Sequence, residues 1–167
     1  MVKFKHFFFL FLLISTQAIA QSEKDAVAAV LDKWHRAAAE GNGDAYFGAM
    51  TKESIFIGTD PTENWNLDAF KAFSKQYFDK GKAWDFKPVE RNIYFSDDKT
   101  IAWFDELLDT WMKLCRGSGV LKKENGQWKI AHYVLSIAIP NDNTNEVIKV
   151  KKEFDDAYLV KLKDSKK

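Results

Sequence analysis

The chain has 167 residues, of which 25 are basic and 24 acidic, giving a net charge of +1. This near balance gives no electrostatic reason to expect binding to nucleic acid or to an anionic membrane surface. The first twenty residues have the pattern of a cleavable signal peptide: Lys3 and Lys5, an apolar run over 7–14, and small residues ending at Ala20. The run is shorter than the roughly 20 residues that span a bilayer. We therefore expect a periplasmic or secreted protein with no stable membrane insertion after leader removal.

Residues 21–167 are sufficient for one domain with its own hydrophobic core. Loss of Lys3 and Lys5 would shift the net charge to about −1. The single cysteine, Cys115, cannot form an internal disulfide. It is expected to be a buried small apolar side chain; a free thiol or a bond between chains is the alternative.

Three helices are expected before residue 80. The first begins with a capping-box-like segment at Ser22 and ends before the glycines at 41 and 43, with apolar residues at helical spacing between them. A second, short helix is predicted over 44–50. Asn66 can cap a third, with Phe70 and Phe73 on its apolar side. A short strand over 54–58 and a turn over 59–62 separate the second and third helices.

From residue 84 onward the apolar period changes from helical to alternating. Strands are predicted over 84–95, 100–110, 111–122 and 127–138, and Asn125-Gly126 suits the tight turn between the last two. Pro88 indicates an edge strand or a bulge. Helices followed by an antiparallel meander predict an α+β fold, with helices packed on one face of a curved sheet.

After Pro140 the chain is polar and then regains helical periodicity over 145–162. We therefore divide the chain into a leader (1–20), a domain (21–140), and a linker with a C-terminal helical tail (141–167). The apolar stripe of this tail is expected to pack on its own domain; packing on a partner subunit is the alternative.

Several segments, in this order, resemble the SnoaL-like branch of the nuclear transport factor 2-like superfamily. They are Gly43-Asp-Ala-Tyr-Phe47, Ile57-Gly-Thr-Asp60, Ile101-Ala-Trp103, Gly119-Val-Leu121 and Trp128-Lys-Ile-Ala-His-Tyr133. The resemblance implies a cone-shaped, cystatin-like fold, in which a bent mixed sheet wraps around the N-terminal helices and a pocket opens at the wide end. This superfamily contains isomerases, cyclases, dehydratases and binding modules, so the resemblance does not imply one reaction. Val134 stands where relatives often have a second histidine.

Two residues are candidate catalytic bases. Alternation from Trp103 places Asp105 inward, and a carboxylate among aromatic rings has a raised pKa. Alternation from Trp128 likewise places His132 inward, and imidazole titrates in a useful range for proton transfer. Asp105 could instead form an ion pair with Arg116 that closes the wide end, and Glu106 replaces Asp105 if the alternation is shifted by one residue. A neutral, hydrogen-bonded structural role is the alternative for His132.

The remaining candidates would bind ligand around the pocket mouth. Asp60 belongs to a polar rim or, alternatively, bonds its own turn. The other predicted ligand-binding residues are Trp65, Trp103, Arg116, Tyr133 and Ser136. The aromatic residues either line an apolar cavity or fill the core. His35 and His132 are the histidines beyond the leader and are far apart in sequence, so no metal site is predicted, and no cofactor is expected.

The sequence therefore predicts an exported domain that binds a small, mainly apolar molecule in a cone pocket. One alternative is a proton-transfer enzyme of the isomerase, cyclase or dehydratase type, using Asp105 or His132. The other is an assembly module that forms a homodimer through its sheet face. Whether the domain catalyses a reaction is left open.

Overall fold

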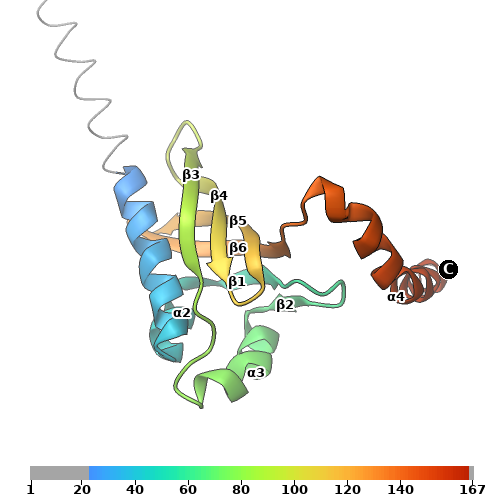
Figure 1. The fold of residues 1–167 in the computed structure, drawn as a ribbon. Coiled ribbons are helices and arrows are strands. Elements are labelled where there is room, and N and C mark those ends of the chain that lie inside the picture. Colours follow the sequence, from blue (N-terminus) through green and yellow to red (C-terminus); the bar gives the residue numbers. More distant parts are fainter. Residues whose placement is uncertain (1–22, 166–167) are drawn as a thin grey trace, which may run out of the picture. The chain divides into compact units, whose positions relative to one another are not determined.

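A computed structural model describes residues 23–165 and is drawn in Figure 1. The predicted signal peptide lies outside the described residues. The chain divides into two compact units between Ile137 and Ala138. Among the described residues, no helix is long and apolar enough to cross a lipid bilayer.

Three helices precede most of the sheet in the first unit. The N-terminal helix occupies residues 23–39, and α2 (Gly43–Gly48) and α3 (Leu67–Phe78) follow. Asparagine side chains cap the last two: Asn42 Oδ1 accepts from the Ala45 amide at 3.0 Å, and Asn66 Oδ1 accepts from the Ala69 amide at 2.9 Å. Figure 1 shows the N-terminal helix beside the sheet. The three predicted helices are present, but α2 ends earlier than expected because Met50 begins a strand.

Six strands form one mixed sheet in the order β2-β1-β6-β5-β4-β3. Parallel pairing joins β1 to β6, and the other neighbours are antiparallel. The predicted α+β fold, with helices and a curved mixed sheet, is thus confirmed. The strands are β1 (Met50–Ile57), β2 (Asn64–Asn66), β3 (Lys87–Phe95), β4 (Ile101–Thr110), β5 (Lys113–Glu124) and β6 (Gln127–Ile137).

Local signals account for two features of the sheet. Asn125 and Gly126 have φ angles of 51° and 79°, as a tight hairpin turn between β5 and β6 requires. Pro88 lies on the edge strand β3, and the β3–β4 register shifts between Pro88 and Glu90. The short strand β2 carries no such signal, and it exists because it pairs with the end of β1.

A bulge in β6 changes the direction of its side chains. Leu121 of β5 pairs with Ile130, whereas the adjacent Val120 pairs with His132, so Ala131 is an extra residue. Trp128 and Ile130 are buried before the bulge, and Tyr133 and Leu135 are buried after it. Alternation along β6 therefore shifts by one residue at Ala131.

One face of the sheet packs against the helices and forms the core. Aromatic rings fill its centre: Trp34 of the N-terminal helix stacks on Tyr46 at 4.8 Å, and Phe56 stacks on Phe70 at 3.9 Å. Tyr133 packs edge-on against Trp34. Cys115 is buried, as the sequence predicts, and forms no disulfide within the described residues. The space enclosed by sheet and helices is thus occupied by side chains.

The second unit consists of a short 3-10 helix, η1 (Asn141–Asn143), and α4 (Thr144–Asp164). The extra C-terminal helix is therefore confirmed. Ion pairs one turn apart reinforce α4, including Lys149–Glu146 at 2.7 Å and Lys151–Asp155 at 2.6 Å. Its packing partner stays a prediction.

Candidate functional site

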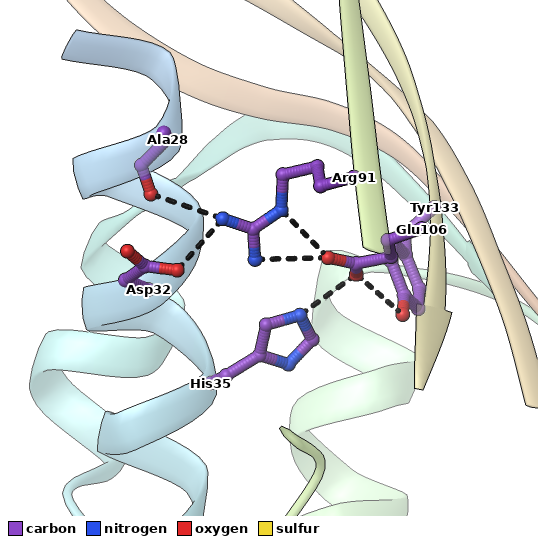
Figure 2. A network of polar contacts seen from close by, with 6 residues as sticks. All are labelled: Ala28, Asp32, His35, Arg91, Glu106 and Tyr133. Carbon is purple, nitrogen blue, oxygen red and sulfur yellow. Dashed lines mark hydrogen bonds and ion pairs between the residues drawn. The ribbon is translucent and has the colours of Figure 1, made fainter. Parts of the chain in front are cut away.

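A buried carboxylate, Glu106 of β4, is the centre of the main polar cluster inside the first unit (Figure 2). Its Oε1 accepts hydrogen bonds from His35 Nε2 at 2.8 Å and from the Tyr133 hydroxyl at 3.2 Å. Its Oε2 accepts from Arg91 Nε at 2.9 Å. Arg91 Nη2 is also 2.9 Å from this oxygen, an ion-pair contact without hydrogen-bond alignment. The cluster joins the N-terminal helix to strands β3, β4 and β6.

Arg91 extends the cluster toward the surface of the N-terminal helix. Its Nη1 donates to Asp32 Oδ1 at 2.7 Å and to the Ala28 carbonyl at 3.4 Å. One guanidinium therefore bridges an inner and an outer carboxylate, a geometry that the planar fork of arginine suits. A buried charge is tolerated only when it is paired and hydrogen-bonded, and Glu106 meets that requirement.

The partners of Glu106 determine its protonation state. Burial raises the pKa of this carboxyl, but hydrogen bonds and positive charge from His35 and Arg91 outweigh burial, and the pKa falls below its usual value. Burial, with the nearby Glu106 charge, raises the pKa of Tyr133 well above its usual value. Glu106 is therefore ionised and the Tyr133 hydroxyl is protonated at neutral pH.

A cleft of about 290 Å³ lies beside His35. His35 is 4 % exposed and donates through Nε2 to Glu106, whereas its Nδ1 has no hydrogen-bond partner among residues 23–165. We call this hollow the His35 cleft; its lining consists of Asp32, His35, Arg36, Ala39, Asp85, Phe86, Lys87 and Pro88.

A larger groove, of about 560 Å³, lies between the N-terminal helix, α2 and the β5–β6 hairpin. Its lining is mostly small or apolar, and Trp34 and Trp128 are its buried aromatic members. Lys33 and Lys129 are the charged residues among those that line it. We call it the Lys33 groove; it is lined by Ala26, Val30, Lys33, Trp34, Ala45, Gly48, Ala49, Gly126, Gln127, Trp128 and Lys129.

The family model of the SnoaL-like domain matches residues 27–140. The chain belongs to this family. A search of the curated proteins gives no match.

Solved structures agree on the fold. An NTF2-like protein of unknown function from Pseudomonas putida is similar at 11 % identity and TM-score 0.60, covering 74 % of this chain and 92 % of that one. An uncharacterised protein with a cystatin-like fold from Caulobacter vibrioides is similar at 14 % identity and TM-score 0.56, covering 78 % of this chain and 99 % of that one. A putative calcium/calmodulin-dependent protein kinase II association domain from Xanthomonas campestris is similar at 21 % identity and TM-score 0.52, covering 69 % of this chain and 86 % of that one. At these identities the likeness shows the fold alone.

The predicted inward orientation of Asp105, Arg116 and His132 in this SnoaL-like domain is wrong. All three lie on the outer sheet face, opposite the helices, where Asp105 pairs loosely with Arg116 at 3.4 Å. The ion-pair alternative for Asp105 describes this contact, although it lies outside the core. A catalytic role for Asp105 or His132 stays a prediction that has lost its geometric basis.

Two separate causes shift the alternation. On β4 the inward residues are Ala102, Phe104 and Glu106, because Trp103 is directed outward, 46 % exposed, and stacks on Tyr94 at 6.1 Å. The inward carboxylate is therefore Glu106, which the sequence analysis gave as the alternative to Asp105 for an alternation shifted by one residue. On β6 the bulge at Ala131 turns His132 outward although Trp128 is buried.

The remaining predicted residues do not converge on one pocket. Asp60 Oδ1 accepts from the Thr62 amide at 2.8 Å, and its bonds to Thr62 lower the pKa of Asp60, as its turn alternative implies. Trp65 stacks on Phe73 at 4.4 Å at the edge of the core. Tyr133 is a core residue bonded to Glu106, and Ser136 is exposed. None of the predicted site residues lines the Lys33 groove or the His35 cleft.

Sequence reasoning missed His35 and Arg91 as partners of an inner carboxylate. A signal for His35 was present, since it follows Leu31 by four residues on the apolar side of the first predicted helix. Arg91 had no comparable signal, because it follows the register shift at Pro88 on an edge strand. In the described part of the chain, no group of three or more His, Cys, Asp or Glu side chains is placed to hold a metal ion.

Proposed function

We propose that this SnoaL-like domain is exported and binds a small, mainly apolar molecule in the Lys33 groove. The groove itself supports the proposal: its volume of about 560 Å³ lies within the roughly 300–1,000 Å³ of small-molecule sites. Alanines and glycines leave the space, and most of the lining side chains are small or apolar.

This placement differs from the expected pocket at the wide end of the cone. Trp34, Tyr46 and Tyr133 are all nearly inaccessible, and both tyrosines pack against Trp34 in the interior. The Glu106 carboxylate already accepts hydrogen bonds from three side chains of the protein, so it is not open to a ligand. The groove offers open apolar surface instead.

Mass spectrometry under native conditions tests ligand binding directly. The protein is purified from periplasm, and retained small molecules are measured after gentle ionisation. Ala26 and Ala29 are both exposed on the N-terminal helix, but only Ala26 is among the groove-lining residues. Ala26→Trp is expected to abolish retention, whereas the matched control Ala29→Trp keeps it. Equal retention by both variants would place the ligand elsewhere.

Export is tested with the same sample by its intact mass. A mature protein that begins near Gln21 in the periplasmic fraction supports cleavage of the leader. A mass beginning at Met1 in the membrane fraction contradicts it.

A second candidate function, homodimeric assembly, is favoured by the outer sheet face. The strand register aligns Tyr94, Trp103, Val120, His132 and Ile55 in one row across five strands. Tyr94 and Trp103 are exposed and stacked, which suits a protein interface. A covering copy of the same chain would bury this row.

Analytical ultracentrifugation distinguishes assembly from a monomer. Trp103→Lys is expected to convert a dimer to monomers, because it inserts a charge into the row. Val89→Lys is the matched control, since Val89 is exposed on β3 outside the row. A wild-type protein that is monomeric at high micromolar concentration would refute this function and leave ligand binding unaffected.

A further inference from the structure

We propose that the ligand of the Lys33 groove has an anionic group, a carboxylate attached to an apolar body, and that Lys33 and Lys129 bind this group. The inference rests on the proposed binding function and adds the chemical class of the ligand. It follows from which hydrogen-bonding groups the groove supplies.

The charged side chains of the lining are donors. Each lysine ammonium has three N–H donors and no acceptor. No aspartate or glutamate is among the groove-lining residues that the structure describes. Gln127 is the lining side chain that can also accept. A ligand rich in acceptors complements this set, and one that carries a cation does not.

The two lysines are available for a ligand. Lys33 is exposed and forms no hydrogen bond or ion pair with any residue in 23–165, and Lys129 donates to the Gly48 carbonyl at 3.1 Å. Glu23, a nearby carboxylate on the same helix, is already bound to Lys123 at 2.7 Å and to Trp128 Nε1 at 2.9 Å. It therefore stabilises the edge of the groove without neutralising its lysines.

Two probes of equal chain length test the inference by calorimetry. Decanoate and decanol share an apolar chain but differ in charge, and both are used below their aggregation limits. Decanoate is expected to bind about tenfold tighter, the effect of two partly exposed ion pairs. The double variant Lys33→Met with Lys129→Met is expected to remove this preference.

The matched control is Lys24→Met with Lys122→Met. Both lysines are exposed and lie outside the groove lining, so net charge changes equally while the groove is intact. The control is expected to keep the full preference for decanoate. If the control also lost the preference for decanoate, the effect would be one of general charge, and the inference would be overturned.

The outcomes separate the two proposals. Equal binding of decanoate and decanol overturns the anionic class, although a small apolar ligand is still bound. Failure of both probes, together with no molecule retained in native mass spectra, overturns the groove as a binding site and the inference with it. Thermal unfolding of each variant confirms that it is folded.

Discussion

Asp105 and Glu106 are adjacent carboxylates on β4 with opposite environments. Glu106 is fully buried and accepts from His35, Arg91 and Tyr133, whereas Asp105 lies on the outer face and contacts Arg116 at 3.4 Å. Side chains alternate between the faces of a strand, so a shift of one residue exchanges these roles. The environment of each acid therefore depends on which face of the sheet the helices cover.

The largest expected effect distinguishes the two acids by stability. Glu106→Gln removes the buried carboxylate charge and leaves Arg91 paired with Asp32 alone. We expect a loss of about 3–5 kcal/mol in the free energy of unfolding, because breaking a buried ion pair is strongly destabilising. Asp105→Asn is expected to cost less than about 1 kcal/mol, because its pair is partly exposed. Urea denaturation measures both. Similar losses would contradict the assigned environments.

A smaller effect is expected at Gly117, which pairs with Glu106 across β4 and β5. A β-carbon there would clash with the Tyr133 hydroxyl and lie 3.0 Å from the Glu106 side chain. Gly117→Ala should destabilise by about 1–3 kcal/mol through overpacking. Gly48 has no atom within 4 Å of such a carbon, so Gly48→Ala is the control and should cause no loss. Differential scanning calorimetry would reveal whether both behave alike.

The lowered pKa of Glu106 predicts a pH dependence of stability. The unfolded chain binds the proton more tightly than the folded one, so stabilisation is complete above about pH 5 and declines as pH falls through the lowered pKa. In Glu106→Gln this contribution is absent. Glu23, whose pKa is lowered by Lys123 and Trp128, acts in the same direction. In Glu23→Gln, the loss of stability at low pH that is due to Glu106 should therefore remain. Urea unfolding midpoints measured across pH test this.

The smallest effect should be found for the pair between Asp105 and Arg116. A double-mutant cycle of Asp105→Asn and Arg116→Gln is expected to give a coupling energy of about 0.2–1 kcal/mol, decreasing in high salt. The same cycle between Glu106 and Arg91 should give a larger and less salt-dependent value. Equal coupling in both cycles would remove the distinction between the sheet faces.

Local sequence signals predicted most elements of this SnoaL-like domain. Asn66 identifies the start of α3, and Asn125-Gly126 identifies the β5–β6 turn, because caps and tight turns depend on a few neighbouring residues. The helical spacing after Pro140 predicts α4. By contrast, β2 and the parallel pairing of β1 with β6 depend on residues distant in sequence.

The residues of the candidate site depended on tertiary structure more than the helices and strands did. Both faces of β4 carry large apolar residues, Trp103 on one and Phe104 on the other, so alternation alone does not identify the core face. The bulge at Ala131 has no glycine or proline to indicate it, and it reverses the orientation of His132. The cluster of Glu106 with His35 and Arg91 forms across three separate elements.

The sequence by itself determined where helices and strands occur and that they combine into an α+β domain, because periodicity, caps and turns act over a few residues. Tertiary structure alone decided which sheet face is covered, which acid is buried, and where open space is left between the N-terminal helix and the β5–β6 hairpin. The physical reason is that burial and cavities arise from packing between distant segments, and a strand with apolar residues on both faces is compatible with either orientation.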